Sequence, residues 1–113
     1  LPEVEITRRG IAPHVEGRTV TGVVVRHHGL RWPVPRTLGE HLAGARIRAV
    51  TRRAKYLLLD CGGETLLIHL GMSGSLRVVP GDTPPGPYDR FDLRVGDSIV
   101  RLRDPRRFGA VLW

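Results

Sequence analysis

Short strand-like segments follow one another closely in this chain, and they constrain its fold more than any other feature. Six of them span residues 46–53, 56–60, 65–70, 75–79, 91–95 and 98–103. Turn sequences such as Cys61-Gly62-Gly63 and Gly96-Asp97 separate neighbouring segments. Strands this short and this closely spaced pair antiparallel in a sandwich or a barrel. The stretch 80–87 is rich in Pro and Gly, so we expect it to form the longest loop and a mobile one.

A helix and a further strand are expected ahead of these segments. Val4, Ile11 and Val15 recur at near-helical spacing. Because Pro suits a first helical turn and acidic residues follow it, the helix is predicted over residues 2–16. The β-branched run 19–25 then predicts a strand.

A second, shorter helix is predicted between that strand and the six later segments. Thr37 is expected to cap a helix over residues 38–43, which Gly44 closes. The predicted fold class is therefore α+β, mostly β. It is a two-sheet antiparallel β-sandwich with an N-terminal helix and one short inserted helix.

The composition fits a single domain with a modest core. The chain has 113 residues, of which 41% are apolar. It contains no run of about 18 apolar residues, which excludes a membrane-spanning helix. Charge within the first five residues argues against a secretory signal. The single cysteine, Cys61, permits no internal disulfide and no cysteine-rich zinc site, which is consistent with a reducing cytoplasm, and we expect it to be structural and inert.

The charge of the chain points to a polyanionic partner. The formal net charge is +7 and the pI is about 11.2. Lys55 is the only lysine, so arginine carries nearly all of the positive charge. The excess of arginine over lysine has two readings: a GC-rich genome, or selection for the planar guanidinium that suits phosphate. Neither reading accounts for the formal net charge of +7, and this net charge favours nucleic-acid binding.

The segment Asp104-Pro105-Arg106-Arg107-Phe108-Gly109 carries the clearest candidate binding residues. Pro interrupts strand pairing, so Arg106, Arg107 and Phe108 are expected on a loop at a sheet edge. There the arginines can hold DNA backbone or an unpaired base, while Phe108 inserts into the base stack. The alternative is a solvated arginine pair beside a core phenylalanine.

Two other segments carry further candidates. Met72 lies between Gly71 and Ser73-Gly74, and on such a turn its flexible side chain can fill a gap in a duplex; the alternative is core packing. His69, just upstream, is able to donate to a phosphate, although a supporting or core histidine is the competing reading. Lys55 follows Arg52-Arg53, and by itself this cluster reads as a solvated strand end.

Four segments together resemble the formamidopyrimidine-DNA glycosylase family: LPEVEITRRG at 1–10, RRAKYLL at 52–58, HLGMSGSL at 69–76 and DPRRFG at 104–109. The resemblance covers essentially the whole chain. It implies that residues 1–113 are the N-terminal, catalytic-side domain of a bifunctional DNA glycosylase/AP lyase. Such an enzyme excises oxidised purines (8-oxoguanine, formamidopyrimidines) and cuts the strand by β,δ-elimination through a Schiff base. The alternatives are an endonuclease VIII-type enzyme for oxidised pyrimidines, a non-catalytic module that binds damaged DNA and, less favoured, an RNA-binding sandwich.

The resemblance also implies roles for individual residues. Lys55 would reach the phosphate near the damaged nucleotide and take part in proton transfer. Met72, Arg106 and Phe108 would fill the void that the extruded nucleotide leaves, with Arg107 beside them. Tyr88 replaces the first His of the family's His-Asp-His-Val-Asp stretch; a phenol donates one hydrogen bond but carries no positive charge, so Arg90 is expected to substitute in part. Glu3 matches the second Glu of the family's N-terminal pattern, as a supporting active-site residue.

The family's nucleophilic Pro and proton-donating Glu would stand ahead of Leu1, outside this sequence. The nitrogen of Pro2 is an amide and cannot replace that amine. The resemblance places the helix–two-turn–helix and the zinc finger outside the sequence as well. We therefore expect the chain as written to be inactive alone, with no cofactor in this domain and zinc in the other half. The expected partner is double-stranded damaged DNA, bound by a monomer in the bacterial cytoplasm.

Overall fold

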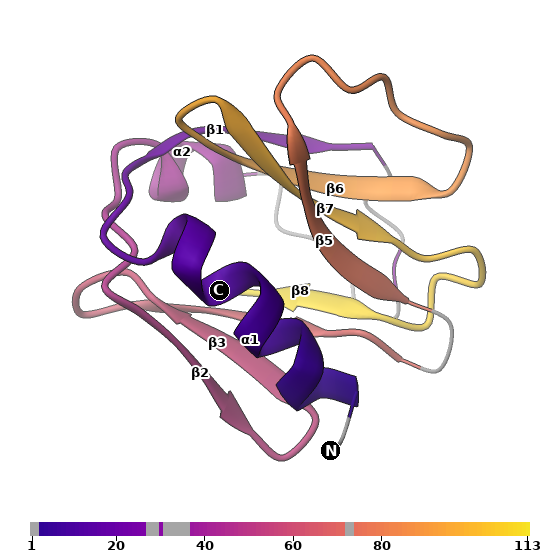
Figure 1. Ribbon diagram of the computed structural model, residues 1–113, viewed down its shortest axis with the longest axis horizontal. Helices are drawn as coiled ribbons and strands as arrows, with labels where there is room; N and C mark the ends of the chain where they lie inside the picture. Colours follow the sequence, from indigo (N-terminus) through magenta and orange to yellow (C-terminus); the bar gives the residue numbers. More distant parts are fainter. Residues whose placement is uncertain (1–2, 27–29, 31–36, 72–73) are drawn as a thin grey trace.

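The computed structural model describes residues 3–26, 30, 37–71 and 74–113 of the chain. Two antiparallel four-stranded sheets form two layers with the core between them (Figure 1). The helices are α1 (Glu3–Val15) and α2 (Leu38–Leu42). The strands are β1 (Val20–Val25), β2 (Ala49–Arg53), β3 (Tyr56–Asp60), β4 (Thr65–His69), β5 (Ser75–Pro80), β6 (Asp89–Val95), β7 (Ser98–Arg103) and β8 (Ala110–Leu112). The strand orders are β1-β6-β7-β5 and β2-β3-β4-β8, which confirms the predicted two-sheet sandwich with two helices.

Alternating side chains in the paired strands build the core. In β3 and β4, Leu57 faces Ile68 and Leu59 faces Leu66 across the sheet, and all four are fully buried. Side chains two residues apart share one face of a strand, so each of these strands presents a continuous apolar face to the other layer. The opposite sheet contributes its own buried set: Phe91, Leu93, Val100 and Leu102.

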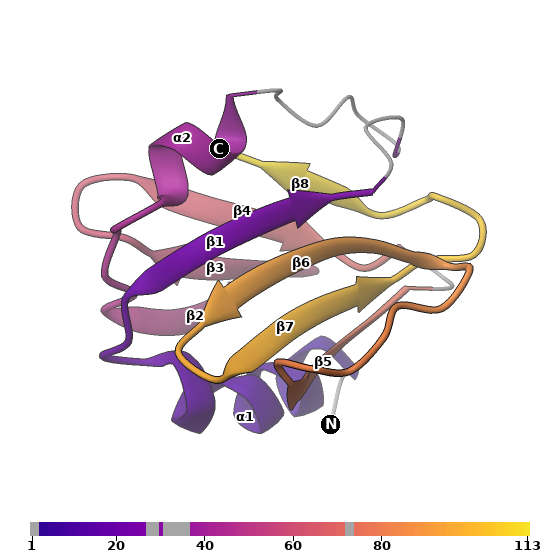
Figure 2. The ribbon, with the colours of Figure 1, turned by 90° about the horizontal axis from the view of Figure 1, so that it is seen from above.

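Each helix closes one open side of the sandwich. Helix α1 packs against β2 of one sheet and β5 of the other, and it buries Ile11, Ala12 and Val15 there. Helix α2 packs against β1 on the other side (Figure 2). Because α1 spans the gap between the two sheets, its first residue, Glu3, is fixed relative to the hairpin between β2 and β3. No helix in the described part of the chain is long and apolar enough to cross a bilayer.

Some predicted boundaries are wrong. Strand β2 begins at Ala49 rather than residue 46, and Arg46 makes only an isolated bridge to Thr19. Thr37 occupies the N-cap position of α2, but its side chain makes no capping hydrogen bond. Strand β8 was not predicted at all. It has three residues and follows a Pro-containing loop, so only its pairing with β4 identifies it.

The loop after β5, residues 80–87, which the sequence predicts to be mobile, is anchored to the sheet by hydrogen bonds. The cause is a buried ion pair on the outer face of the first sheet, where Arg101 of β7 lies opposite Asp92 of β6. Arg101 Nη1 donates to the carbonyl of Pro84 and Nη2 to that of Thr83, at 3.2 and 3.0 Å. Arg101 is 1% exposed and Asp92 is fully buried, so the loop covers a charge pair that needs these carbonyls.

The buried pair is held in its charged form. Arg101 Nε donates to Asp92 Oδ1 at 2.9 Å, and Arg26 Nη1 lies 2.7 Å from Asp92 Oδ2 as an ion pair without an aligned hydrogen bond. Burial alone raises the pKa of Asp92, but the hydrogen bonds from Arg101 and the positive charges of Arg26 and Arg101 outweigh it, and the pKa lies below its usual range. The network therefore holds β1, β6 and β7 together at neutral pH.

Candidate functional site

A pocket of about 300 Å³ brings together three residues that the sequence predicted for the site. Its lining consists of Glu3, Val4, Lys55, His69, Leu70 and Gly71. Glu3 comes from the first turn of α1, Lys55 from the β2–β3 hairpin and His69 from the end of β4. These positions are 14 or more residues apart in sequence. The pairing of β3 with β4, in which Tyr56 lies opposite His69, brings Lys55 and His69 together, and the packing of α1 on β2 and β3 adds Glu3.

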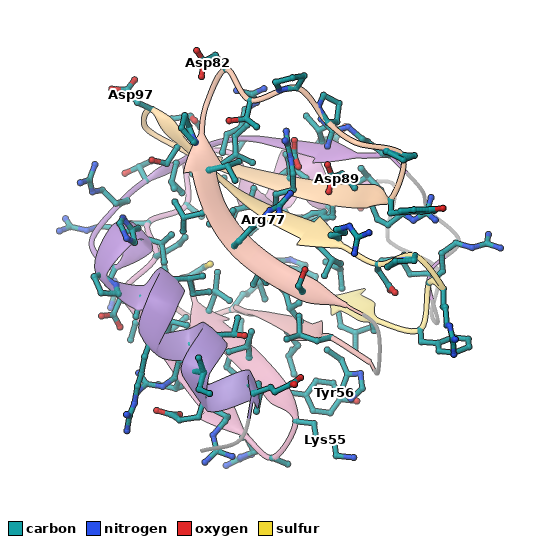
Figure 3. All side chains as sticks on the ribbon, turned by 45° about the vertical axis from the view of Figure 1, so that its right-hand side comes forward. Lys55, Tyr56, Arg77, Asp82, Asp89 and Asp97 are labelled. Carbon is teal, nitrogen blue, oxygen red and sulfur yellow. The ribbon has the colours of Figure 1, made fainter. Side chains whose placement is uncertain are left out.

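Lys55 occupies a tight and strained hairpin. The last pair of β2 and β3 is Arg53 with Tyr56, which leaves Ala54 and Lys55 as a two-residue turn. Ala54 has a φ of +54°, in the left-handed region that costs a residue with a Cβ about 1–2 kcal/mol. Arg52 Nη1 donates to the Ala54 carbonyl at 3.3 Å, which supports the turn. Figure 3 shows Lys55 projecting from the tip of this hairpin beside Tyr56.

The hydrogen bonding of His69 determines which of its nitrogens is protonated. The Gly71 N–H donates to His69 Nδ1 at 3.1 Å, so Nδ1 is the acceptor and the neutral ring carries its proton on Nε2. The ring packs against Tyr56, with 5.1 Å between the ring centroids. The Gly71 N–H and the Tyr56 ring thus position this half-buried imidazole at the pocket.

The second group of predicted residues lies on the loop of residues 104–109, here called the wedge loop. Asp104 is fully buried, and its Oδ2 accepts a hydrogen bond from the Gly109 N–H at 2.7 Å. Arg106, Arg107 and Phe108 are exposed, Phe108 by 47%. The alternative reading, a core phenylalanine, is therefore wrong.

The wedge loop adjoins the pocket through two glycines. Gly71 has a φ of +66°, and a Cβ there would lie 2.9 Å from the carbonyl of Phe108. A Cβ on Gly109 would lie 2.6 Å from the His69 carbonyl oxygen. The end of β4 and the wedge loop thus meet backbone to backbone, which only residues without a side chain allow. Pocket and wedge loop form one continuous surface; Met72, predicted to extend it, lies outside the described residues.

Arg90 braces the wedge loop. Its Nε donates to the Asp104 carbonyl at 3.0 Å and its Nη2 to the Pro105 carbonyl at 3.2 Å. Arg90 was expected to replace part of a DNA contact, but two of its donors are directed into the protein. The N–H of Asp104 in turn donates to the Tyr88 carbonyl at 2.9 Å, so the start of β6 and the wedge loop are tied together.

Tyr88 stacks with two guanidinium groups. Tyr88 is 43% exposed, and the guanidinium carbons of Arg90 and Arg103 lie 5.8 and 5.4 Å from the centroid of its ring. Arg103 was not among the predicted site residues. The only available signal was its place directly before Asp104, at the exposed end of a strand.

A cluster around Glu5, which was not predicted from the sequence either, connects α1 to strand β2. Arg8 Nη2, Arg9 Nε and Arg52 Nε lie 2.7, 3.0 and 3.2 Å from its carboxylate oxygens. Hydrogen bonds from Arg8, and then from Arg9 and Arg52, lower the pKa of Glu5 to about 2 although partial burial opposes the shift. Arg52 belongs to β2, so this carboxylate holds α1 against the strand that leads to Lys55.

Cys61 lies away from this surface. Its half-buried thiol contacts the Leu59 carbonyl at 3.5 Å, and burial raises its pKa, as does the nearby charge of Asp60. A raised pKa favours the neutral thiol, which agrees with the structural role expected for Cys61. Within the part of the chain that the structure describes, no three His, Cys, Asp or Glu side chains are grouped to hold a metal ion.

Comparison with known proteins places this geometry in context. The sequence profile described as the formamidopyrimidine-DNA glycosylase N-terminal domain matches residues 1–111. The formamidopyrimidine-DNA glycosylases of Janthinobacterium sp. (strain Marseille) and Geobacter sulfurreducens are 61% and 60% identical over the whole chain. The chain spans 41% and 42% of their lengths. The Lactococcus lactis Fpg (MutM), solved with FAPY-dG-containing DNA, superposes on 97% of this chain and 42% of its own with a TM-score of 0.90 at 28% identity.

Proposed function

Because this chain belongs to the formamidopyrimidine-DNA glycosylase N-terminal domain family, we propose that it is the catalytic-side domain of a base-excision repair glycosylase. One observation carries the proposal: Glu3, Lys55 and His69 line one pocket, and the exposed wedge loop borders it. An enzyme that acts on a base in a duplex must extrude the nucleotide and occupy the gap left behind. The pocket and the wedge loop supply these two parts side by side.

In this proposal the wedge loop replaces the extruded nucleotide. Phe108 projects into solvent and is placed to enter the base stack, while Arg106 and Arg107 offer guanidinium donors to backbone and unpaired base. The hydrogen bonds of Arg90 to the loop backbone and of the Gly109 N–H to buried Asp104 hold the loop in this conformation for DNA contact. A preformed loop loses less conformational entropy on binding.

The pocket serves the chemistry at the sugar. In the reaction that we propose, a terminal amine ahead of Leu1 attacks C1′, and the bond from C1′ to the damaged base breaks, so that the base leaves and the amine loses its proton. The C1′–O4′ bond then breaks as O4′ takes up a proton, which opens the sugar and forms the Schiff base between C1′ and the nitrogen. Abstraction of a proton from C2′ then expels the 3′ phosphate. Lys55 is placed to hold the adjacent phosphate and to move protons in the elimination, His69 Nε2–H to donate to phosphate, and Glu3 to support the bound sugar.

The remaining assignments complete the proposal. We propose double-stranded DNA as the partner, which the net charge of +7 supports. We also propose that the enzyme binds it as a monomer. Oxidised purines are the proposed substrates, since the Lactococcus lactis relative was solved with FAPY-dG-containing DNA. We assign no cofactor to these residues and place zinc in the other half of the enzyme.

The test is excision under single-turnover conditions by the full-length polypeptide that carries this domain. We expect release of 8-oxoguanine and formamidopyrimidine from duplex DNA, with slower release of thymine glycol. Faster release of thymine glycol would favour the endonuclease VIII-type alternative. Tight binding of damaged duplex with no release of any base would favour the non-catalytic module.

A further inference from the structure

The stack around Tyr88 suggests a DNA contact that the sequence did not. Tyr88 was expected to face DNA with its phenol hydroxyl. Its ring instead carries two guanidinium groups within the distance of a cation–π interaction, Arg103 at 5.4 Å and Arg90 at 5.8 Å. The exposed ring of Tyr88 thus holds two guanidinium groups by stacking, and we call this role of the ring a platform.

The two arginines are not equivalent. Arg90 is half-buried and directs its Nε and Nη2 to the carbonyls of Asp104 and Pro105. Arg103 is exposed. Among the described residues its side chain makes no ion pair, and its one aromatic contact is the stack on Tyr88. Asp89 faces Arg103 across the strands, but its carboxylate is buried and accepts from the Gly86 N–H at 2.6 Å. Arg103 therefore keeps its donors for a partner from solution.

The position of Arg103 joins it to the surface already described. It is the last residue of β7 and directly precedes the wedge loop. In the sheet it pairs with Ser75, the first residue of β5, and the N–H of the preceding Gly74 donates to the carbonyl of Leu70, a pocket residue, at 2.9 Å. Arg103 thus adjoins the wedge loop in sequence and, through Ser75, the chain that leads from the pocket to β5.

We propose that Arg103, held on the ring of Tyr88, contacts a DNA backbone phosphate beside the wedge loop. Tyr88 acts as the platform and not as the hydrogen-bond donor. Stacking limits the conformations of the long side chain before DNA arrives, and the in-plane N–H groups of a stacked guanidinium remain able to bind phosphate in a bidentate manner. This inference rests on the proposed function, since it takes the wedge loop to face DNA.

The test is the salt dependence of binding to a duplex with a tetrahydrofuran abasic analogue, measured by fluorescence anisotropy on the full-length polypeptide. Removing one phosphate contact lowers the magnitude of the slope of log K against log salt concentration by about 0.9. We expect this decrease, with a several-fold loss of affinity at low salt, for Arg103→Ala and for Tyr88→Ala. Tyr88→Phe keeps the ring and should keep both affinity and slope.

The matched control is Arg48→Ala, which removes the same charge from an exposed side chain. Arg48 lies against Gly62 in the β3–β4 turn, at the other end of these strands from Lys55 and His69. Its slope should equal that of the parent. If the parent binds DNA and the Arg103→Ala and Arg48→Ala variants give equal slopes, this inference is overturned while the proposed function stands. A decrease with Tyr88→Phe as large as with Tyr88→Ala would overturn the platform role. A parent that does not bind the duplex would overturn the proposed function itself.

Discussion

The N–H of Gly109 donates a 2.7 Å hydrogen bond to the buried carboxylate of Asp104, and this contact closes the wedge loop on itself. The four residues between Asp104 and Gly109 include both exposed arginines and Phe108. Asp104 thus has a structural role: it is buried, whereas Arg106 and Arg107 of the same loop are exposed.

Asp104→Ala should lower stability and DNA affinity together. The change leaves the buried N–H of Gly109 without its partner, which costs about 1–3 kcal/mol, and it releases the loop. Chemical denaturation and duplex binding measure the two effects. Asp82→Ala, at an exposed position in the loop after β5, is the control and should change neither. A wild-type affinity for Asp104→Ala would contradict the bracing role.

Phe108→Ala should impair excision far more than folding. The side chain is 47% exposed, so its loss should change the free energy of unfolding by no more than about 0.5 kcal/mol. Filling the gap in the stack offsets a few kcal/mol of unstacking, so the single-turnover rate should fall at least about tenfold. We predict the same for Met72→Ala. Ile6→Ala, at an exposed apolar position on α1, is the control; a fall in melting temperature with intact excision would make Phe108 a packing residue.

Asp92→Asn should destabilise the fold strongly. It leaves Arg101, which is 1% exposed, without its charge partner, and breaking a buried ion pair costs about 3–5 kcal/mol. Asp97→Asn removes an exposed carboxylate near the other end of the same sheet and should have little effect. Urea denaturation gives both values. If the two variants were equally stable, the buried pair would not hold the sheet and its covering loop.

Stability should decrease in acid in a way that depends on Glu5. The pKa of Glu5 is about 2 in the folded chain against an ordinary value of 4.5. A lowered folded pKa means that the stabilisation is fully present above about pH 4.5 and is lost as the pH falls toward 2. Melting temperatures between pH 2 and 6 should therefore fall less steeply for Glu5→Gln than for the parent. Glu40→Gln, an exposed carboxylate on α2, should follow the parent curve; a Glu5→Gln curve with the parent slope would refute the linkage.

Local patterns made most of the fold predictable. Strands β3 and β4 show in the sequence as short apolar runs bounded by turn residues, whereas the alternation of their buried side chains appears only in the structure. Strand β8 could not be predicted, because three residues hold no periodicity and their pairing with β4 joins positions more than 40 residues apart. The anchored loop was missed for a similar reason. Its composition is typical of a mobile segment, and the arginine that holds it lies on a later strand.

The candidate site was predictable where its residues are contiguous in short sequence motifs. The wedge loop and Lys55 were found in this way, and the structure places them on one surface with Glu3 and His69. Arg103 and the Glu5 cluster were missed because their partners come from distant elements. Glu5 and Arg52 are 47 residues apart, and the stack of Arg103 on Tyr88 depends on the register of β6 and β7.

The central claim is that this pocket acts on a sugar attacked by an amine ahead of Leu1, and borohydride trapping on an abasic duplex tests it most directly. The full-length polypeptide should be compared with Pro-Glu ahead of Leu1, with Leu1 as the first residue, and with Pro-Glu plus either Lys55→Ala or Arg48→Ala. Two residues span up to roughly 7 Å, whereas attack requires an approach of roughly 3 Å. We predict rapid trapping with Pro-Glu and with Arg48→Ala, trapping slower by at least about tenfold with Lys55→Ala, and only background when Leu1 is first. Robust trapping by the form that begins at Leu1, or equal trapping by the Lys55→Ala and Arg48→Ala variants, would contradict the account.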